Sequence, residues 1–186
     1  DRADGRGGVV RARTQRAWLV PPAAAVATAL LALDAAGSEE LASLVSAVGE
    51  RWLDVLPSTT EPARRPEPQV WSPLEYACHV RDVCALATYR VTLMLDEDVP
   101  LFANWDQDVT AVEERYASQD PITVNDDLGR RAREFADRLA SVPDDAWDRA
   151  GRRSDGARFT VESFARYLLH DPIHHLTDVT GVRWSD

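Results

Sequence analysis

The chain contains no lysine, only two cysteines and no apolar run of membrane-spanning length, and each shortage excludes a class of function. All 21 basic residues are arginine, and 31 acidic residues outnumber them, which gives a formal net charge of −10. Nonspecific affinity for nucleic acid comes from clustered basic side chains that neutralise phosphates. Nucleic acid is therefore not an expected partner.

The two cysteines, Cys78 and Cys84, are not placed for a disulfide or a structural metal site. They lie six residues apart in a segment with helical spacing, which turns them to different faces and keeps them too far apart to join. Neither belongs to a CxxC pair, so a zinc knuckle is excluded. We expect reduced thiols in a cytoplasmic protein.

The first 37 residues lack the pattern of a folded unit. Asp1–Arg16 is rich in glycine and arginine, and the apolar stretch Ala17–Leu33 is interrupted by Pro21 and Pro22. A membrane span needs about 20 continuous apolar residues, and the proline pair would cut a helix. We expect residues 1–37 to be a flexible extension, disordered or not native to the protein, and residues 182–186 to be a tail; no membrane partner is expected.

What the sequence does contain is a series of amphipathic segments with the helical period. Apolar residues recur at this period over Ser38–Leu56, Pro73 to about Leu95, Thr123–Ser141, and Thr160 to about Gly181. No alternating strand run competes with them. The sequence predicts an all-α fold, an up-down-up-down four-helix bundle over residues 38–181, with its second and fourth helices running in the same direction.

Two helix starts carry specific capping signals. Ser72, Pro73 and Glu75 form a capping box with proline at the first helical position. Thr160 is the expected N-cap of the last helix, with Phe159 and Phe164 spaced as a hydrophobic staple. The connection from residue 96 to 122 is too long for a plain turn and is a candidate functional loop.

Histidines on the second and fourth helices could meet inside such a bundle. His170 and His174 are four residues apart and share one side of the last helix, and His79 lies beside the apolar stripe of the second. Three neutral imidazoles would hold a divalent ion and leave a position open, as in catalytic zinc sites. The alternative is that each is an ordinary structural histidine. His175 is rotated about 100° from His174 and is expected to face away.

Pro172 decides whether the predicted site exists. If Asp171 and Pro172 began a new helix, His170 would leave the face of His174. The apolar stripe passes through Pro172 without a change of phase, so we expect one continuous, kinked helix.

Further polar residues could complete the site. Asp82 or Asp171 could orient an imidazole ring from behind the ligands. Trp105, Asp106 and Asp108, in the long connection, could contact a substrate; the alternative is that Trp105 fills the core and the two acids cap a helix.

Three motifs in this order resemble those of the DinB-like superfamily of four-helix-bundle metalloproteins. They are W-S-P-L-E-Y-A-C-H-V-R-D-V from residue 71, N-W-D-Q-D from residue 104 and H-D-P-I-H-H-L-T-D from residue 170. The resemblance covers residues 38–181. It implies a divalent metal on His79, His170 and His174, with zinc expected and nickel or iron as alternatives.

The resemblance also implies a chemistry. Similar proteins include mycothiol-dependent maleylpyruvate isomerase and the bacillithiol transferases, and the bias to arginine, alanine and valine, typical of actinobacterial coding, favours mycothiol. The sequence therefore predicts a thiol-dependent S-transferase or isomerase acting on a small electrophile with a low-molecular-weight thiol. A noncatalytic metal- or ligand-binding bundle and a metal-dependent hydrolase remain alternatives, and a homodimer is left open.

Overall fold

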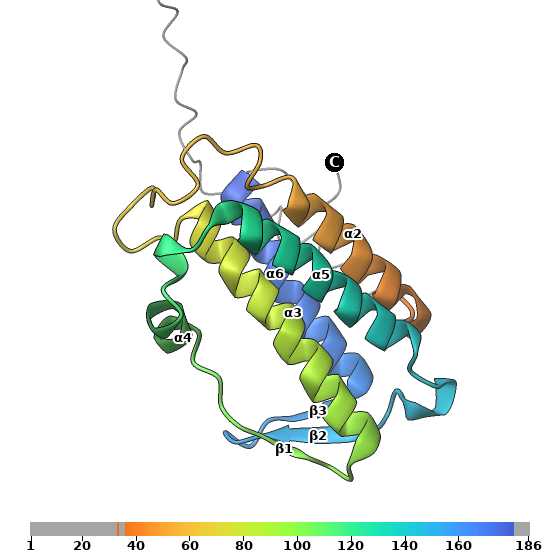
Figure 1. Ribbon diagram of the computed structural model, residues 1–186. Helices are drawn as coiled ribbons and strands as arrows, with labels where there is room; N and C mark the ends of the chain where they lie inside the picture. Colours follow the sequence, from red (N-terminus) through yellow and green to blue (C-terminus); the bar gives the residue numbers. More distant parts are fainter. Residues whose placement is uncertain (1–32, 34–35, 181–186) are drawn as a thin grey trace, which may run out of the picture.

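The computed structural model describes residues 33 and 36–180, and the predicted extension at residues 1–37 and the tail at 182–186 lie almost wholly outside them. Four long helices form the body: α2 (Leu41–Leu53), α3 (Pro73–Asp96), α5 (Pro121–Ala140) and α6 (Val161–Thr180). Figure 1 shows them packed side by side as a bundle. The predicted four-helix bundle is confirmed.

Short elements fill the connections. They are the 3₁₀ turns η1 (Ser38–Glu40), η2 (Tyr116–Ser118) and η3 (Asp144–Ala146), the short helix α4 (Gln107–Glu113), and the strands β1 (Leu101–Phe102), β2 (Ala150–Arg153) and β3 (Arg158–Thr160). The strands form a small sheet in the order β1-β2-β3, with β1 parallel and β3 antiparallel to β2. Each strand has only two to four residues, which is too short to produce a recognisable alternation of apolar and polar residues in the sequence.

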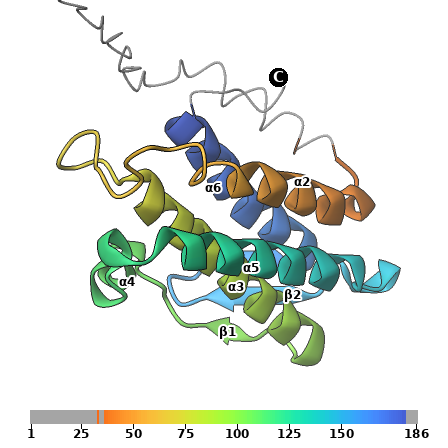
Figure 2. The ribbon, with the colours of Figure 1, turned by 45° about the horizontal axis from the view of Figure 1, so that its top comes forward.

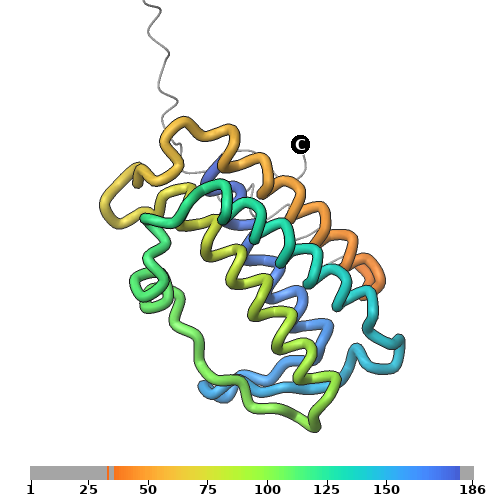
Figure 3. The backbone as a smooth tube through the Cα atoms, viewed as in Figure 1, coloured from red at the N-terminus to blue at the C-terminus, as the bar shows by residue number. Residues whose placement is uncertain are grey.

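The direction of the helices differs from the expected alternation. Near the start of α3, His79 lies beside His175, whereas further along α3 Arg90 lies over the ring of Phe164, so α3 and α6 are antiparallel. The long connection carries the chain back along the bundle, and α5 therefore starts at the same end as α3 (Figure 3). Figure 2 shows α5 lying between α2 and α3. The prediction of an up-down-up-down order, with the second and fourth helices parallel, is therefore wrong, because α3 and α6 are antiparallel.

The predicted helix starts are confirmed. Ser72 accepts a hydrogen bond from Glu75 N, and Glu75 accepts one from Ser72 N. Thr160 Oγ1 accepts from Ser163 N, and the rings of Phe159 and Phe164 pack edge to face at 5.3 Å. These contacts fix where α3 and α6 begin, and so which residues they turn inward.

Helix α6 runs unbroken through Pro172, as the apolar stripe predicted. The carbonyl of Pro172 accepts a hydrogen bond from Trp52 Nε1 at 3.0 Å, which ties α6 to α2 at the proline. Among residues 33 and 36–180, no helix combines the length and the apolarity that a membrane crossing requires.

Candidate metal centre between α3 and α6

His79 is the most buried polar ring of the centre. It is 1% exposed, and Trp105 stacks on it at 5.5 Å with the two planes only 7° apart. Trp71 lies against the same ring at 5.3 Å. The capping box at Ser72 begins α3 two turns earlier and sets the phase that turns His79 toward α6.

Helix α6 presents Asp171 and His175 to this ring. His79 Nε2 is 2.9 Å from Asp171 Oδ2, and His175 Nε2 is 3.3 Å from Asp171 Oδ1. The metal-ligand atoms of these three residues all lie within 4.8 Å of one another. Two imidazoles and a carboxylate are a donor set that suits zinc and neighbouring divalent metals.

A second carboxylate lies on the outer side of His175. Asp178 Oδ2 is 3.3 Å from His175 Nδ1 and 2.9 Å from His174 Nδ1. His175 therefore has a carboxylate at each ring nitrogen. Asp171, His175 and Asp178 are spaced by four and three residues and form one row along α6.

The charges of the centre are shifted by these contacts. Burial alone would lower the pKa of His175, but hydrogen bonds with Asp171 and Asp178 outweigh it and raise the pKa to about 9. Burial would raise the pKa of Asp171, but hydrogen bonds from His175 and His79 hold it well below its usual range. Without a metal, the protonated His175 ring lies between the two carboxylates and compensates their charge.

One observation indicates that these residues fit a metal, and a second sets His79 apart from an ordinary structural histidine. Within the described part of the chain, every ion pair of Asp171 and Asp178 is with a histidine, a ring that can exchange a proton for a metal. In addition, His79 Nδ1, the ring nitrogen opposite the one that faces Asp171, is buried and has no hydrogen-bond partner among the described residues. Buried polar atoms of a purely structural histidine are normally paired, so His79 carries a cost that packing alone does not explain.

The structure does not bring the three predicted histidines together. Two groups of possible metal ligands occur in the described part of the chain, and neither combines His79 with His170 or His174. His170 is exposed, and its ring stacks on His174 at 6.3 Å. His175, expected to face away, lies 5.3 Å from His79 instead. The physical reason is rotation about the helix axis. His170 and His174 are one residue before Asp171 and His175, at almost the same height, but they lie about 100° away around α6.

Of the two acidic residues predicted to contact a substrate, Asp106 caps a helix, as the alternative interpretation stated for both. Asp106 accepts hydrogen bonds from the backbone of Asp108 and Val109 and is the N-cap of α4, and Asp108 lies in the first turn. Trp105 does reach the centre, by stacking on His79. Asp171, predicted to orient a ring from behind, is itself in direct contact with His79.

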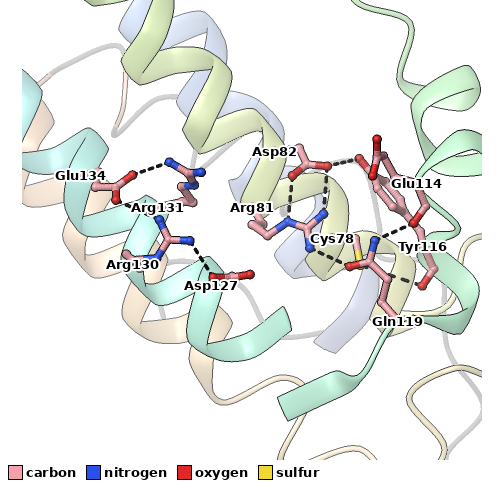
Figure 4. A network of polar contacts seen from close by, with 10 residues as sticks. All are labelled: Cys78, Arg81, Asp82, Glu114, Tyr116, Gln119, Asp127, Arg130, Arg131 and Glu134. Atoms are coloured by element: carbon pink, nitrogen blue, oxygen red, sulfur yellow. Dashed lines mark hydrogen bonds and ion pairs between the residues drawn. The ribbon is translucent and has the colours of Figure 1, made fainter. Parts of the chain in front are cut away.

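Asp82 belongs to a separate network, shown in Figure 4. Its carboxylate pairs with Arg81 at 2.8 Å and accepts a hydrogen bond from Tyr116 Oη at 2.5 Å, and Arg81 donates to Gln119. Beside this network lies an open hollow of about 340 Å³, lined by residues 81, 82, 85 and 86 of α3 and by Trp105, Thr110 and Glu114. Trp105 therefore separates the hollow from His79.

The cysteines are not poised to react. Cys78 and Cys84 are both buried and unpaired. Burial raises the pKa of each thiol to about 12, so neither is a thiolate near neutral pH.

Comparisons with known proteins agree with this architecture. The sequence matches the model of the DinB superfamily over residues 39–179. The solved structure of YfiT from Bacillus subtilis, described as a probable metal-dependent hydrolase with an unusual four-helix bundle topology, superimposes with a TM-score of 0.72 at 16% identity, covering 77% of this chain and 84% of that one. At that identity the likeness shows the fold. No curated protein sequence matches the chain. Since the family match spans all four long helices up to residue 179, the chain belongs to the DinB superfamily.

Proposed function

We propose that the chain is a metal-dependent enzyme that holds a divalent ion with His79, Asp171 and His175. The observation that carries the proposal is the grouping of their ligand atoms within 4.8 Å of one another around a histidine that is only 1% exposed. The likeness to a fold described elsewhere as a probable metal-dependent hydrolase supports it. Zinc is the expected metal, with nickel or iron as alternatives.

The side chains around the ligands support binding and positioning. Asp178 accepts from His175 Nδ1, which would orient the ring and direct Nε2 inward, as carboxylates do behind many metal-binding histidines. Trp105 covers the face of His79 and excludes water from it. Three protein ligands leave coordination positions open for a small molecule, which distinguishes catalytic from structural sites.

A metal at these residues would lower the pKa of a thiol or water that it binds and so supply a nucleophile near neutral pH. The chain has no thiol of its own to offer there, because Cys78 and Cys84 are buried and their pKa values are raised to about 12. The nucleophile is therefore external. We propose a low-molecular-weight thiol of the mycothiol type, and hence an S-transferase or isomerase.

Hydrolysis is the second candidate, and the description of YfiT as a probable metal-dependent hydrolase favours it. The two candidates differ only in whether the external nucleophile is a thiol or water. In both, the hollow beside Trp105 is the proposed place for the electrophile, because it opens next to the indole that covers His79. A cytoplasmic location is part of this proposal, since cytoplasmic thiols are kept reduced.

A turnover assay separates the candidates. The protein loaded with zinc is offered a panel of electrophiles and esters, each with mycothiol, bacillithiol, glutathione or no thiol. We expect conversion that requires a thiol; conversion without thiol would establish the hydrolase instead. His79→Ala and His175→Ala should abolish it, whereas Cys78→Ser and His170→Ala should not. Tight zinc binding with no conversion above the metal-free control would overturn the enzymatic function and leave a noncatalytic metal-binding bundle.

A further inference from the structure

The outer end of the histidine cluster has the composition of a second metal site. His174, His175 and Asp178 place their ligand atoms within 4.8 Å of one another. The inner group uses His175 through Nε2, which lies beside Asp171, whereas Asp178 lies beside Nδ1 of the same ring. The two groups therefore share one residue but not one atom.

We propose that His174, His175 and Asp178 form a second divalent-cation site on the outer side of α6, next to the inner centre and distinct from it. The expected ions are those that favour imidazole ligands, such as zinc, copper or nickel.

Helical spacing explains why these three residues converge. Asp178 follows His174 by four residues and His175 by three, and both positions are neighbours of Asp178 on a helix surface. The two rings stand at 82° to each other with centroids 5.8 Å apart, so they reach the same carboxylate oxygen from different directions. The site is built by one helix and needs no movement of another.

The side chains of the outer group are exposed enough to bind a hydrated ion. The side chain of His174 is 41% exposed and that of Asp178 is 26% exposed, in contrast to 1% for His79. An ion can reach the outer group from solvent and keep water in its remaining positions. The inner centre, in contrast, lies behind Trp105.

Charge balance favours a second ion. Among the described residues, the two carboxylates of the cluster, Asp171 and Asp178, form ion pairs with imidazoles alone. An inner ion would lie beside Asp171, whereas Asp178 lies at the opposite nitrogen of the His175 ring. An outer ion held by His174, His175 and Asp178 would supply the positive charge at this second carboxylate.

Binding stoichiometry tests the outer site without any activity assay. Metal-free protein is titrated with zinc by calorimetry, at metal concentrations near that of the protein, and bound zinc is counted after dialysis. We expect two ions per chain in the wild type and one in His174→Ala, with Asp178→Asn also losing the outer ion. His170→Ala is the matched control, because His170 is an exposed neighbour on the same helix outside both groups, and it should retain two ions.

The inner centre is tested separately in the same experiment. His79→Ala should keep one ion, the outer one, and the double variant His79→Ala with His174→Ala should bind none. A wild type whose single ion is lost in His79→Ala and kept in His174→Ala, a His174→Ala variant that still binds two ions, or a His170→Ala variant that loses one would each overturn the outer site. Loss of an ion in His174→Ala but not in His79→Ala would instead contradict the inner centre. Circular dichroism melting confirms that each variant is folded.

Discussion

The α2–α5 seam and the part of the α3–α6 seam around His79 are built from different kinds of residues. At the first, Gly49 of α2 approaches Ala132 so closely that an added Cβ would lie 2.7 Å from the alanine methyl, and the surrounding side chains are apolar. At the second, His79, Asp171 and His175 meet, and His79 Nδ1 has no hydrogen-bond partner in the described part of the chain. Burying polar groups contributes little to stability. The apolar packing of the first seam is therefore expected to stabilise the fold more than the polar cluster around His79, which is the proposed binding site.

The largest expected effect on folding comes from opening a cavity at the apolar seam. Leu128 of α5 is fully buried, at 0% exposure, in the core cluster. Leu128→Ala should lower the free energy of unfolding by about 3 kcal/mol, because it removes buried apolar atoms and leaves a cavity. Urea denaturation measures this. Zinc affinity of the folded variant should equal that of the wild type, and a variant that loses both together would contradict the separation of the two seams.

A smaller effect is expected at the buried ion pair that starts α3. The side chain of Glu75 is 3% exposed and pairs with Arg65 while it also caps the helix. Burial alone would raise the pKa of Glu75, but hydrogen bonds from Arg65 and Ser72 outweigh it and lower the pKa below its usual value of 4.5. Because the folded pKa is the lower one, the charged form stabilises the fold above pH 4.5, and this contribution is lost as the pH falls through the lowered value.

Glu75→Gln removes that contribution. At pH 7 the variant should be less stable than the wild type by about 2 kcal/mol, since it loses charged hydrogen bonds. The difference should shrink as the pH is lowered below 4.5. Unfolding curves of both proteins across pH measure it, and a difference that stays constant down to the acid transition would show that the ion pair is not its source.

The smallest expected effect lies outside both seams. Asp106 caps α4, so Asp106→Ala should destabilise that short helix by about 1 kcal/mol, whereas Asp106→Asn keeps an acceptor and should change little. Hydrogen exchange of residues 107–113 measures the local change. Zinc affinity should be the same in both variants. A weaker affinity in either would indicate that Asp106 takes part in binding.

The sequence predicted most of the bundle because its signals are local. The capping box at Ser72, the staple of Phe159 and Phe164 and the continuous stripe through Pro172 each depend on residues a few positions apart. The small sheet escaped prediction because its strands are only two to four residues long, and β1 pairs with β2 across the whole stretch that contains α4 and α5. Helix direction was also not a local property, since the long connection determines it.

Of the candidate centre, the sequence identified His79 but not its partners on α6, because those partners also depend on non-local structure. His79 was identified from its own helix, but the partners on α6 depend on how the two helices are oriented. One signal was present in the sequence: Asp171, His175 and Asp178 repeat at spacings of four and three, and such a row of ionisable residues bordering an apolar stripe is a face that can meet a partner. The pair His170 and His174 has the same spacing but lies further toward solvent.

Anomalous diffraction from crystals grown with zinc, recorded at the zinc edge, tests the central claim most directly because it places the ion among the histidines. The account predicts a strong peak between α3 and α6, within bonding distance of about 2.0 to 2.2 Å of nitrogens of His79 and His175 and an oxygen of Asp171. A peak bound by His170 and His174, with none at His79, would contradict it.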